Sequence, residues 1–122
     1  MQIPQPAKLL RIHLSESDRY QGRPLSEAIV AKCRELEISG ATVFQGLEGF
    51  GETAELHRAH LIRHDQPVVI VIVDTAEKIA HLVSAIEPML ETGLMSVSDV
   101  EMIRVTNPGA PPSAAPPTNP LS

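Results

Sequence analysis

The sequence contains few aromatic residues, a single cysteine and no excess of positive charge. Only 2% of its 122 residues are aromatic, so a hydrophobic core must be built from aliphatic side chains. Because Cys33 is the only cysteine, no disulfide can form within the chain. Cys33 also falls on the apolar side of a predicted helix, which favours a buried thiol over a nucleophile.

The charge balance and the lack of long apolar segments exclude several classes of protein. The formal net charge is -5, whereas non-specific binding to nucleic acid depends on Lys and Arg neutralising phosphates. No apolar segment reaches the roughly 18 residues that a membrane-spanning helix needs, and the N-terminus lacks the apolar core of a signal peptide. We therefore expect a cytoplasmic protein that neither binds nucleic acid nor inserts into a membrane.

The length and the distribution of proline predict one folded domain with two loose ends. Residues 1–7 are short and polar and contain two prolines, so we expect a flexible N-terminal arm. Residues 8–106 carry the regular apolar patterns and form the domain. From residue 107 to residue 122 the chain is rich in Pro, Ala and Ser, which predicts a disordered tail.

The first half of the domain predicts a strand followed by a helix. Residues 8–14 alternate between two faces, and Leu10, Ile12 and Leu14 share the apolar one. After a polar loop over residues 15–23, Pro24 opens a helix with an apolar stripe formed by Leu25, Ala28, Ile29, Cys33 and Leu36. We predict that this helix ends near residues 39–40, where Gly40 can adopt the left-handed conformation.

Residues 40–51 contain four of the seven glycines in the chain. The segment begins as a second strand at residues 42–44 and then passes through Gly46, Gly49 and Gly51. Glycine is usually unfavourable in a strand, so this cluster indicates either a bulged strand end or close approach of a ligand. Both interpretations remain open. A long, mostly hydrophilic loop follows over about residues 52–66, and loops of this length are often functional.

The second half of the domain predicts a strand, a helix and a final strand. Residues 68–73 are all aliphatic and mostly β-branched, which is typical of a strand buried on both faces. Asp74 is predicted to cap a second helix, with Glu77 completing a capping box. Pro88 should kink that helix or end it early, and residues 95–105 form the last strand. The helix has an apolar stripe formed by Ile79, Leu82, Val83, Ile86 and Leu90.

The predicted order of strand, helix, strand, strand, helix, strand is that of an α+β, ferredoxin-like βαββαβ domain. In this topology a four-stranded antiparallel sheet carries two helices on one face. The strand at residues 68–73 is central, so its second face must be covered by something other than these helices. The simplest cover is a closed symmetric oligomer of the same chain.

Three segments together resemble a known family. They are residues 16–25, the Gly-Ala-Thr-Val and Gly-Phe-Gly sequences within residues 40–51, and residues 67–74. In this order they resemble the PII-like proteins of the domain-of-unknown-function 190 group, over about residues 8–105. This group is similar to the PII signalling proteins and to the divalent-cation tolerance (CutA) proteins. The resemblance implies a homotrimer in which the sheets face the three-fold axis.

The resemblance also implies a ligand site and a signalling role. PII proteins bind adenine nucleotides in clefts between subunits, and the long loop after their second strand reports the bound ligand to a partner. By this similarity the loop is at residues 52–66 and the regulated partner is an unknown protein such as a membrane transporter. The implied ligand-binding residues are Thr42, Gly46, Gly49, Phe50 and Gly51, while Arg19 and Arg104 are candidates to meet an anion.

This chain differs from PII where PII proteins hold a triphosphate. PII proteins have basic residues directly after Gly-Phe-Gly and before the last strand. Here Glu52 follows Gly51, and residues 91–96 contain neither Lys nor Arg. A triphosphate would be poorly neutralised, so the implied adenine nucleotide is more easily a mononucleotide or a cyclic nucleotide than ATP.

No catalytic pattern competes with the signalling interpretation. The chain lacks a glycine-rich phosphate loop with its following Lys, and the pair Glu48 and Glu52 lacks a matched nucleophile or metal motif. We therefore predict a protein that is not an enzyme. Two alternatives remain, namely a purely structural oligomeric adaptor and a metal-binding CutA-like trimer that uses His57, His60 and His64.

The metal alternative predicts a specific change in thermal stability. His57, His60 and His64 are three and four residues apart and would share one face of a helix. If they bind a transition metal, Zn²⁺ or Cu²⁺ should raise the melting temperature of the wild-type protein more than that of a His60→Ala variant. Differential scanning fluorimetry measures both shifts, and equal shifts would remove His60 from the site.

Overall fold

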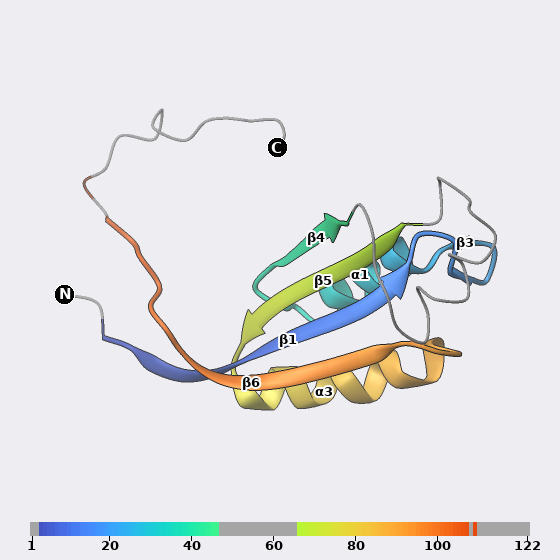
Figure 1. Ribbon diagram of the computed structural model, residues 1–122. Helices are drawn as coiled ribbons and strands as arrows, with labels where there is room; N and C mark the ends of the chain where they lie inside the picture. The colour runs from blue at the N-terminus through green and yellow to red at the C-terminus, as the bar shows by residue number, and fades with distance from the viewer. Residues whose placement is uncertain (1–2, 47–65, 108, 110–122) are drawn as a thin grey trace.

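A four-stranded antiparallel sheet carries two helices on one of its faces (Figure 1). The computed structural model describes residues 3–46, 66–107 and 109. Its elements, in chain order, are β1 (Gln5–Ser15), β2 (Arg19–Tyr20), β3 (Arg23–Pro24), α1 (Leu25–Glu35), β4 (Ala41–Gln45), β5 (Pro67–Asp74), α3 (Ala76–Ile86), the short 3-10 helix η1 (Glu87–Met89) and β6 (Leu94–Met102).

The strand order confirms the predicted ferredoxin-like arrangement. In the sheet, β4 pairs with β5, β5 with β1 and β1 with β6, and every pair is antiparallel. β1 and β5 are therefore central, and β4 and β6 form the two edges. The short strands β2 and β3 make a separate hairpin before α1.

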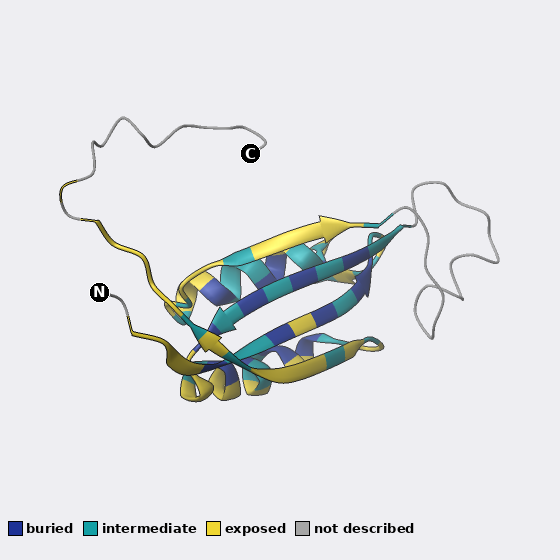
Figure 2. Cartoon of the chain, turned by 60° about the vertical axis from the view of Figure 1, so that its left-hand side comes forward, coloured by how far each residue is buried: buried dark blue, intermediate teal, exposed yellow. Residues whose placement is uncertain are grey.

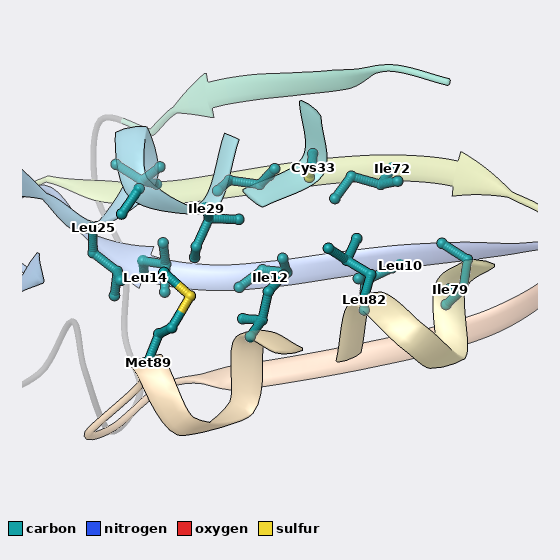
Figure 3. Packing of buried hydrophobic residues seen from close by; sticks show 14 residues of the cluster. Leu10, Ile12, Leu14, Leu25, Ile29, Cys33, Ile72, Ile79, Leu82 and Met89 are labelled. Carbon is teal, nitrogen blue, oxygen red and sulfur yellow. The ribbon is translucent and has the colours of Figure 1, made fainter. Parts of the chain in front are cut away.

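The central strands bury one face under the helices. Along β5, Val68, Ile70 and Ile72 are buried, and the residues between them are half-buried (Figure 2). Aliphatic side chains from β1, β5, α1 and α3 fill the space between the sheet and the helices (Figure 3). Cys33 belongs to this core, and burial raises the pKa of its thiol to about 11, as befits the predicted buried, unreactive cysteine.

The second face of the sheet is not covered by the helices, and we call it the open face. It carries the half-buried β5 residues Val69, Val71 and Val73. The β4 residue opposite Val69 is Phe44, which is 54% exposed. Within the described part of the chain, the strand predicted to be buried on both faces is thus covered on only one of them.

Two strand boundaries differ from the expected ones. β1 begins at Gln5 because its first residues pair with the end of β6, where Gln5 lies opposite Met102. Residues 5–7 of the expected N-terminal arm therefore belong to the sheet. β6 ends at Met102 rather than at residue 105. The predicted tail at residues 107–122 lies outside the described residues except for residues 107 and 109, as does the 52–66 loop except for Gln66.

The prediction that α1 ends near residues 39–40 is wrong. The helix ends at Glu35, and the residue in the left-handed conformation is Glu37, with φ 59°. The Ile38 N–H donates to the Cys33 carbonyl (2.9 Å) and the Glu37 N–H to the Arg34 carbonyl (3.1 Å). This is the Schellman pattern, and half-buried Ile38 packs against the core beside it. The packing of Ile38 against the core thus determines where the helix ends, and it ends before Gly40.

The predicted cap of the second helix is also displaced by one residue. Thr75, rather than Asp74, is the N-cap of α3, and its hydroxyl accepts a hydrogen bond from the Lys78 N–H (3.2 Å). Pro88 lies in η1, directly after α3 ends at Ile86, as predicted. Asp74 therefore has a different role from the one that its position suggests.

Asp74 joins two distant parts of the chain. Its side chain is almost completely buried, at 1% exposure. One carboxylate oxygen accepts from the Ser39 N–H (2.8 Å) and the other from the Thr75 N–H (2.7 Å). Burial alone would raise the pKa of Asp74, but these hydrogen bonds and the nearby Lys78 ammonium outweigh it, so the pKa lies below its ordinary value. The carboxylate thereby fixes the segment that leads into β4.

The lowered pKa of Asp74 predicts how stability depends on pH. An unfolded aspartate has a pKa of about 3.9, so the folded state binds fewer protons in acid. The stabilisation by Asp74 is then present above about pH 4 and lost as the pH falls through the folded pKa. We expect Asp74→Asn to lower the free energy of unfolding by about 1–3 kcal/mol at pH 7. The difference from wild type should shrink below about pH 4.

Urea denaturation across this pH range measures the difference. The control is Asp99→Asn, because Asp99 forms only an exposed ion pair with Lys8 and should cost less than about 1 kcal/mol at pH 7. A wild-type to Asp74→Asn difference that stays constant down to pH 2 would show that the carboxylate charge is not what stabilises this junction.

Candidate functional site

The predicted ligand residues Thr42 and Gly46 lie on and directly after the edge strand β4. Thr42 is exposed on the open face, opposite Val71 of β5. Gly46 follows the strand, and its N–H donates to the Pro67 carbonyl (2.7 Å). A Cβ atom at Gly46 would lie 3.0 Å from Pro67 Cγ, so the close approach of these two segments requires glycine or a shift of the proline ring. Gly46 therefore has a structural reason to be glycine, whether or not a ligand approaches it.

Arg19 lies at the end of the sheet where β1 finishes and β5 begins. It belongs to the β2–β3 hairpin, whose turn residues Gln21 and Gly22 both have positive φ. The Arg19 guanidinium donates to the Glu16 and Asp18 carbonyls, each at 3.3 Å. Glu16 in turn donates its N–H to the Gln66 carbonyl (2.8 Å). The hairpin is thus anchored at the end of the sheet that also contains Gly46.

Arg104 lies at the opposite end of the sheet. The chain leaves β6 and passes the end of the sheet, so that Arg104 Nη2 donates to Ser39 Oγ (2.8 Å) (Figure 1). The Ser39 N–H donates to buried Asp74. Ser39 therefore links Arg104, through its hydroxyl, to the Asp74 carboxylate, through its N–H. Thr42 follows Ser39 by three residues and lies towards the same end. Arg104, Ser39 and Asp74 form a cluster that we call the sheet-end cluster.

Ser39 and Asp74 were missed as site neighbours by the sequence interpretation. The position of Asp74 before an amphipathic segment favours a helix cap. Ser39 lies where the first helix is predicted to end, which gives no indication of a site. The contact that joins them spans 35 residues and the contact from Arg104 to Ser39 spans 65 residues. Neither has a signal in local spacing.

The predicted ligand residues form two groups within one subunit. Arg19 and Gly46 lie at one end of the sheet, and Arg104 and Thr42 lie towards the other. The five residues of β4 alone span about 13 Å at a strand rise of about 3.3 Å per residue. One subunit therefore does not bring Arg104 onto the end of the sheet that holds Gly46. The predicted ligand residues Gly49, Phe50 and Gly51 lie outside the described residues.

The two arginines are available to an anion. In the described part of the chain, the ion pairs are Lys8 with Asp99 and Lys32 with Glu35, and neither includes an arginine. Arg19 and Arg104 are exposed and donate only to uncharged oxygens. Hydrogen bonds from a guanidinium to a phosphate are stronger than those to a neutral oxygen. A phosphate could therefore compete for either side chain.

Two surface hollows lie on the helical side of the sheet. One, of about 440 Å³, is formed between α1 and β4 and is lined by Arg23, Ser26, Glu27, Val30, Arg34 and Val43. The other, of about 240 Å³, lies where the end of α1 meets the start of α3 and is lined by Leu36, Thr75, Glu77, Lys78 and His81. Neither contains a predicted ligand residue, so neither is the expected nucleotide site.

The described residues contain neither a metal-binding cluster nor a helix that could span a membrane. Residues 3–46, 66–107 and 109 contain no group of three or more His, Cys, Asp and Glu side chains that could hold a metal ion. The three candidate metal ligands, His57, His60 and His64, lie outside these residues. Among the described helices, none is long and apolar enough to cross a membrane.

The fold is shared with solved PII-like structures. CPII from Thiomonas intermedia K12, a nitrogen regulatory PII-like protein, has been solved bound to ADP and bicarbonate. This structure superposes with a TM-score of 0.63 at 22% identity, covering 84% of this chain and 93% of that one. Another CPII structure, with ADP, AMP and bicarbonate, gives a TM-score of 0.64. At this level of identity the similarity establishes the fold.

Sequence relatives cover nearly the whole domain. A UPF0166 protein from Aquifex aeolicus is 37% identical over 98 residues, which are 79% of this chain and 92% of the relative. A second UPF0166 protein, from Methanocaldococcus jannaschii, is 32% identical over 101 residues, covering 80% of this chain and 93% of the relative. The DUF190 family model, described as "Uncharacterized ACR", matches residues 7–102. The chain therefore belongs to the DUF190 family, and its fold is that of the PII-like proteins.

Proposed function

We propose that this protein is a non-enzymatic, PII-like regulatory protein that binds an adenine nucleotide between the subunits of a homotrimer. The observation that carries the proposal is the placement of Arg104 beside the segment that leads into β4, exposed and without a carboxylate partner among the described residues. The nucleotide is suggested by CPII, which shares this fold and has been solved with ADP and AMP. The regulated partner would be met by the 52–66 loop.

The open face supports self-association. It combines the half-buried valines of β5 with more exposed side chains, namely Phe44 at 54% and Leu94 at 61% exposure. Phe44, Val69, His13 and Leu94 form one continuous row across all four strands. An apolar surface of this kind on a small protein usually marks an interface. Three copies that pack these faces around an axis would bury it.

A closed ring would also bring the two separated groups of ligand residues together. The Arg104 end and the Gly46 end lie at opposite ends of one subunit, so a head-to-tail arrangement can place Arg104 of one copy near Gly46 and Arg19 of the next. Such a cleft offers backbone groups near glycine and two guanidinium groups for phosphate. The ligand would therefore bind only to the assembled protein.

The charges on the chain favour a nucleotide with one or two phosphates over ATP. Residues 91–96, which precede and begin β6, contain no Lys or Arg, and Glu52 follows the Gly-Phe-Gly sequence. Each additional phosphate adds negative charge that must be neutralised or left in water. Two arginines can neutralise the phosphate of AMP, whereas the diphosphate of ADP would leave about one negative charge over and the triphosphate of ATP about two.

Assembly through the open face predicts that a charge at its centre disrupts the trimer. Val71 lies in the middle of β5 on this face, so Val71→Asp would place a carboxylate in the interface without a partner. We expect light scattering to give about 40 kDa for wild type, three times the 13.2 kDa chain, and a clearly lower mass for the variant at micromolar concentration.

Val97→Asp is the matched control. Val97 is 50% exposed on β6 and lies on the helical side of the sheet, because it pairs with buried Leu10. A variant at this position should remain a trimer. A monomeric wild-type protein would contradict the proposed assembly outright.

Nucleotide binding is tested by isothermal titration of the full-length protein with AMP, ADP, ATP and cyclic AMP. We expect AMP or ADP to bind more tightly than ATP. Arg104→Gln removes a charged hydrogen bond worth about 1.5–3 kcal/mol and should weaken binding about 10- to 100-fold. Arg34→Gln, at an exposed position on α1, should leave the affinity unchanged. If none of the four nucleotides binds, the nucleotide part of the proposal fails.

A further inference from the structure

One row of residues across the open face is polar at its centre. The strand registers place Thr42, Val71, Arg11 and Ser96 side by side, one from each strand, and we call them the Arg11 row. Arg11 belongs to the central strand β1 and is exposed, while its neighbours on the same strand and face, Leu9 and His13, are half-buried. A permanent positive charge thus lies in the middle of an otherwise mainly apolar surface.

The open face carries no carboxylate among the described residues of the sheet. The acidic side chains of β6, Asp99 and Glu101, point to the helical side, where Asp99 pairs with Lys8. Apart from Arg11 and His13, the residues in the central part of the open face are aliphatic, aromatic or hydroxylated: Leu9, Thr42, Phe44, Val69, Val71, Val73, Leu94, Ser96 and Ser98. The described acidic residues of the sheet thus lie away from this face, although the chain as a whole has a net charge of -5.

Arg11 has no partner among the residues that the structure describes. Across the described ranges, no hydrogen bond or ion pair is formed by its guanidinium. Arginine stays protonated at any ordinary pH, so it cannot escape burial by losing its proton. Burying it without a counter-charge costs several kcal/mol in general, which is acceptable only if an anion or several hydrogen bonds compensate.

We propose that the assembled protein binds an inorganic oxyanion, such as phosphate or sulfate, between the Arg11 side chains of its subunits. This rests on the proposed trimer, because only burial of the open face makes the counter-charge necessary. Copies of the same face bring further arginines and no carboxylates, so the negative charge must come from outside the face. A tetrahedral oxyanion matches the fork of the guanidinium and can be shared by several arginines.

The neighbours of Arg11 suit such a site. Ser96 lies directly opposite Arg11, and residues paired in this way have Cβ atoms about 5 Å apart, close enough for a hydroxyl to donate to the same anion. On the other side of Arg11, Val71 contributes an apolar wall that keeps out water and strengthens the electrostatic attraction. The site lies within the sheet face, away from the sheet-end cluster that contains Arg104.

The test compares inorganic phosphate with chloride at equal ionic strength on the full-length protein. Phosphate should raise the melting temperature of the wild-type trimer by on the order of 5 °C. Ser96→Ala should show a smaller rise. Arg11→Met, which keeps the length of the side chain without its charge, should show none, and in chloride it should be at least as stable as wild type because no uncompensated charge remains. Arg34→Gln, on α1 at the helical side of the sheet, should respond like wild type.

Other results would overturn the proposal. If the trimer does not respond to phosphate or sulfate, or if Arg11→Met responds like wild type, no such site exists. If Arg11→Met dissociates in chloride, Arg11 is paired with a carboxylate of a neighbouring copy. Arg11→Lys provides a second variant should Arg11→Met not fold, and it should retain a reduced response because it keeps the charge and loses the fork.

Two further measurements separate this site from the nucleotide site. Light scattering of the wild-type protein shows whether the trimer exists, and a monomer would refute both proposals. A trimer without a phosphate response would refute only the anion site. AMP should still stabilise Arg11→Met if its phosphate is bound by Arg104, whereas loss of the AMP response in Arg11→Met would assign Arg11 to the nucleotide and contradict a separate oxyanion site.

Discussion

The alternation of side chains along β5 is the constraint on which the rest of the structure depends. Val68, Ile70 and Ile72 are buried beneath the helices, so Val69, Val71 and Val73 must point to the other side. The register with β1 fixes this choice, because a slip by one residue would exchange the two faces. Since both sets are aliphatic, the strand requires two apolar environments. The described residues supply one of them, and the open face is the direct result.

Local periodicity was sufficient to predict this architecture. The alternation of β1 and the apolar stripes of α1 and α3 each have a signal within a dozen residues, and the resulting order of elements allows few topologies. The errors occurred where a distant contact decides a local feature. Glu37, rather than Gly40, adopts the left-handed backbone conformation, because Ile38 packs against the core. Asp74 is not the cap of α3 because its carboxylate is drawn inwards to the Ser39 N–H.

The candidate site was less predictable for the same reason. Thr42, Gly46, Arg19 and Arg104 were identified by their residue types and by resemblance, but only the structure places them at two ends of a sheet. Their separation cannot be inferred from spacing in the sequence, since it depends on strand pairing. The structure also gives a different reason for the glycine at position 46, because its close contact with Pro67 requires that it have no side chain. In the proposed trimer, the residues that complete the cleft come from another copy.

Arg104 and Arg11 lie in different surroundings, which suit the first to ligand binding and the second to subunit assembly. Arg104 is exposed at the edge of the domain and is held only by a serine hydroxyl, so a ligand can exchange there at little cost in desolvation. Arg11 lies in the middle of the face that assembly would bury, where removing its counter-charge would oppose the packing of the subunits. In the proposed trimer, an anion at the first position could therefore exchange, as a signalling role requires, whereas an anion at the second would be part of the assembled structure. Because the two positions lie on different parts of the sheet, changing one charge leaves the other in place.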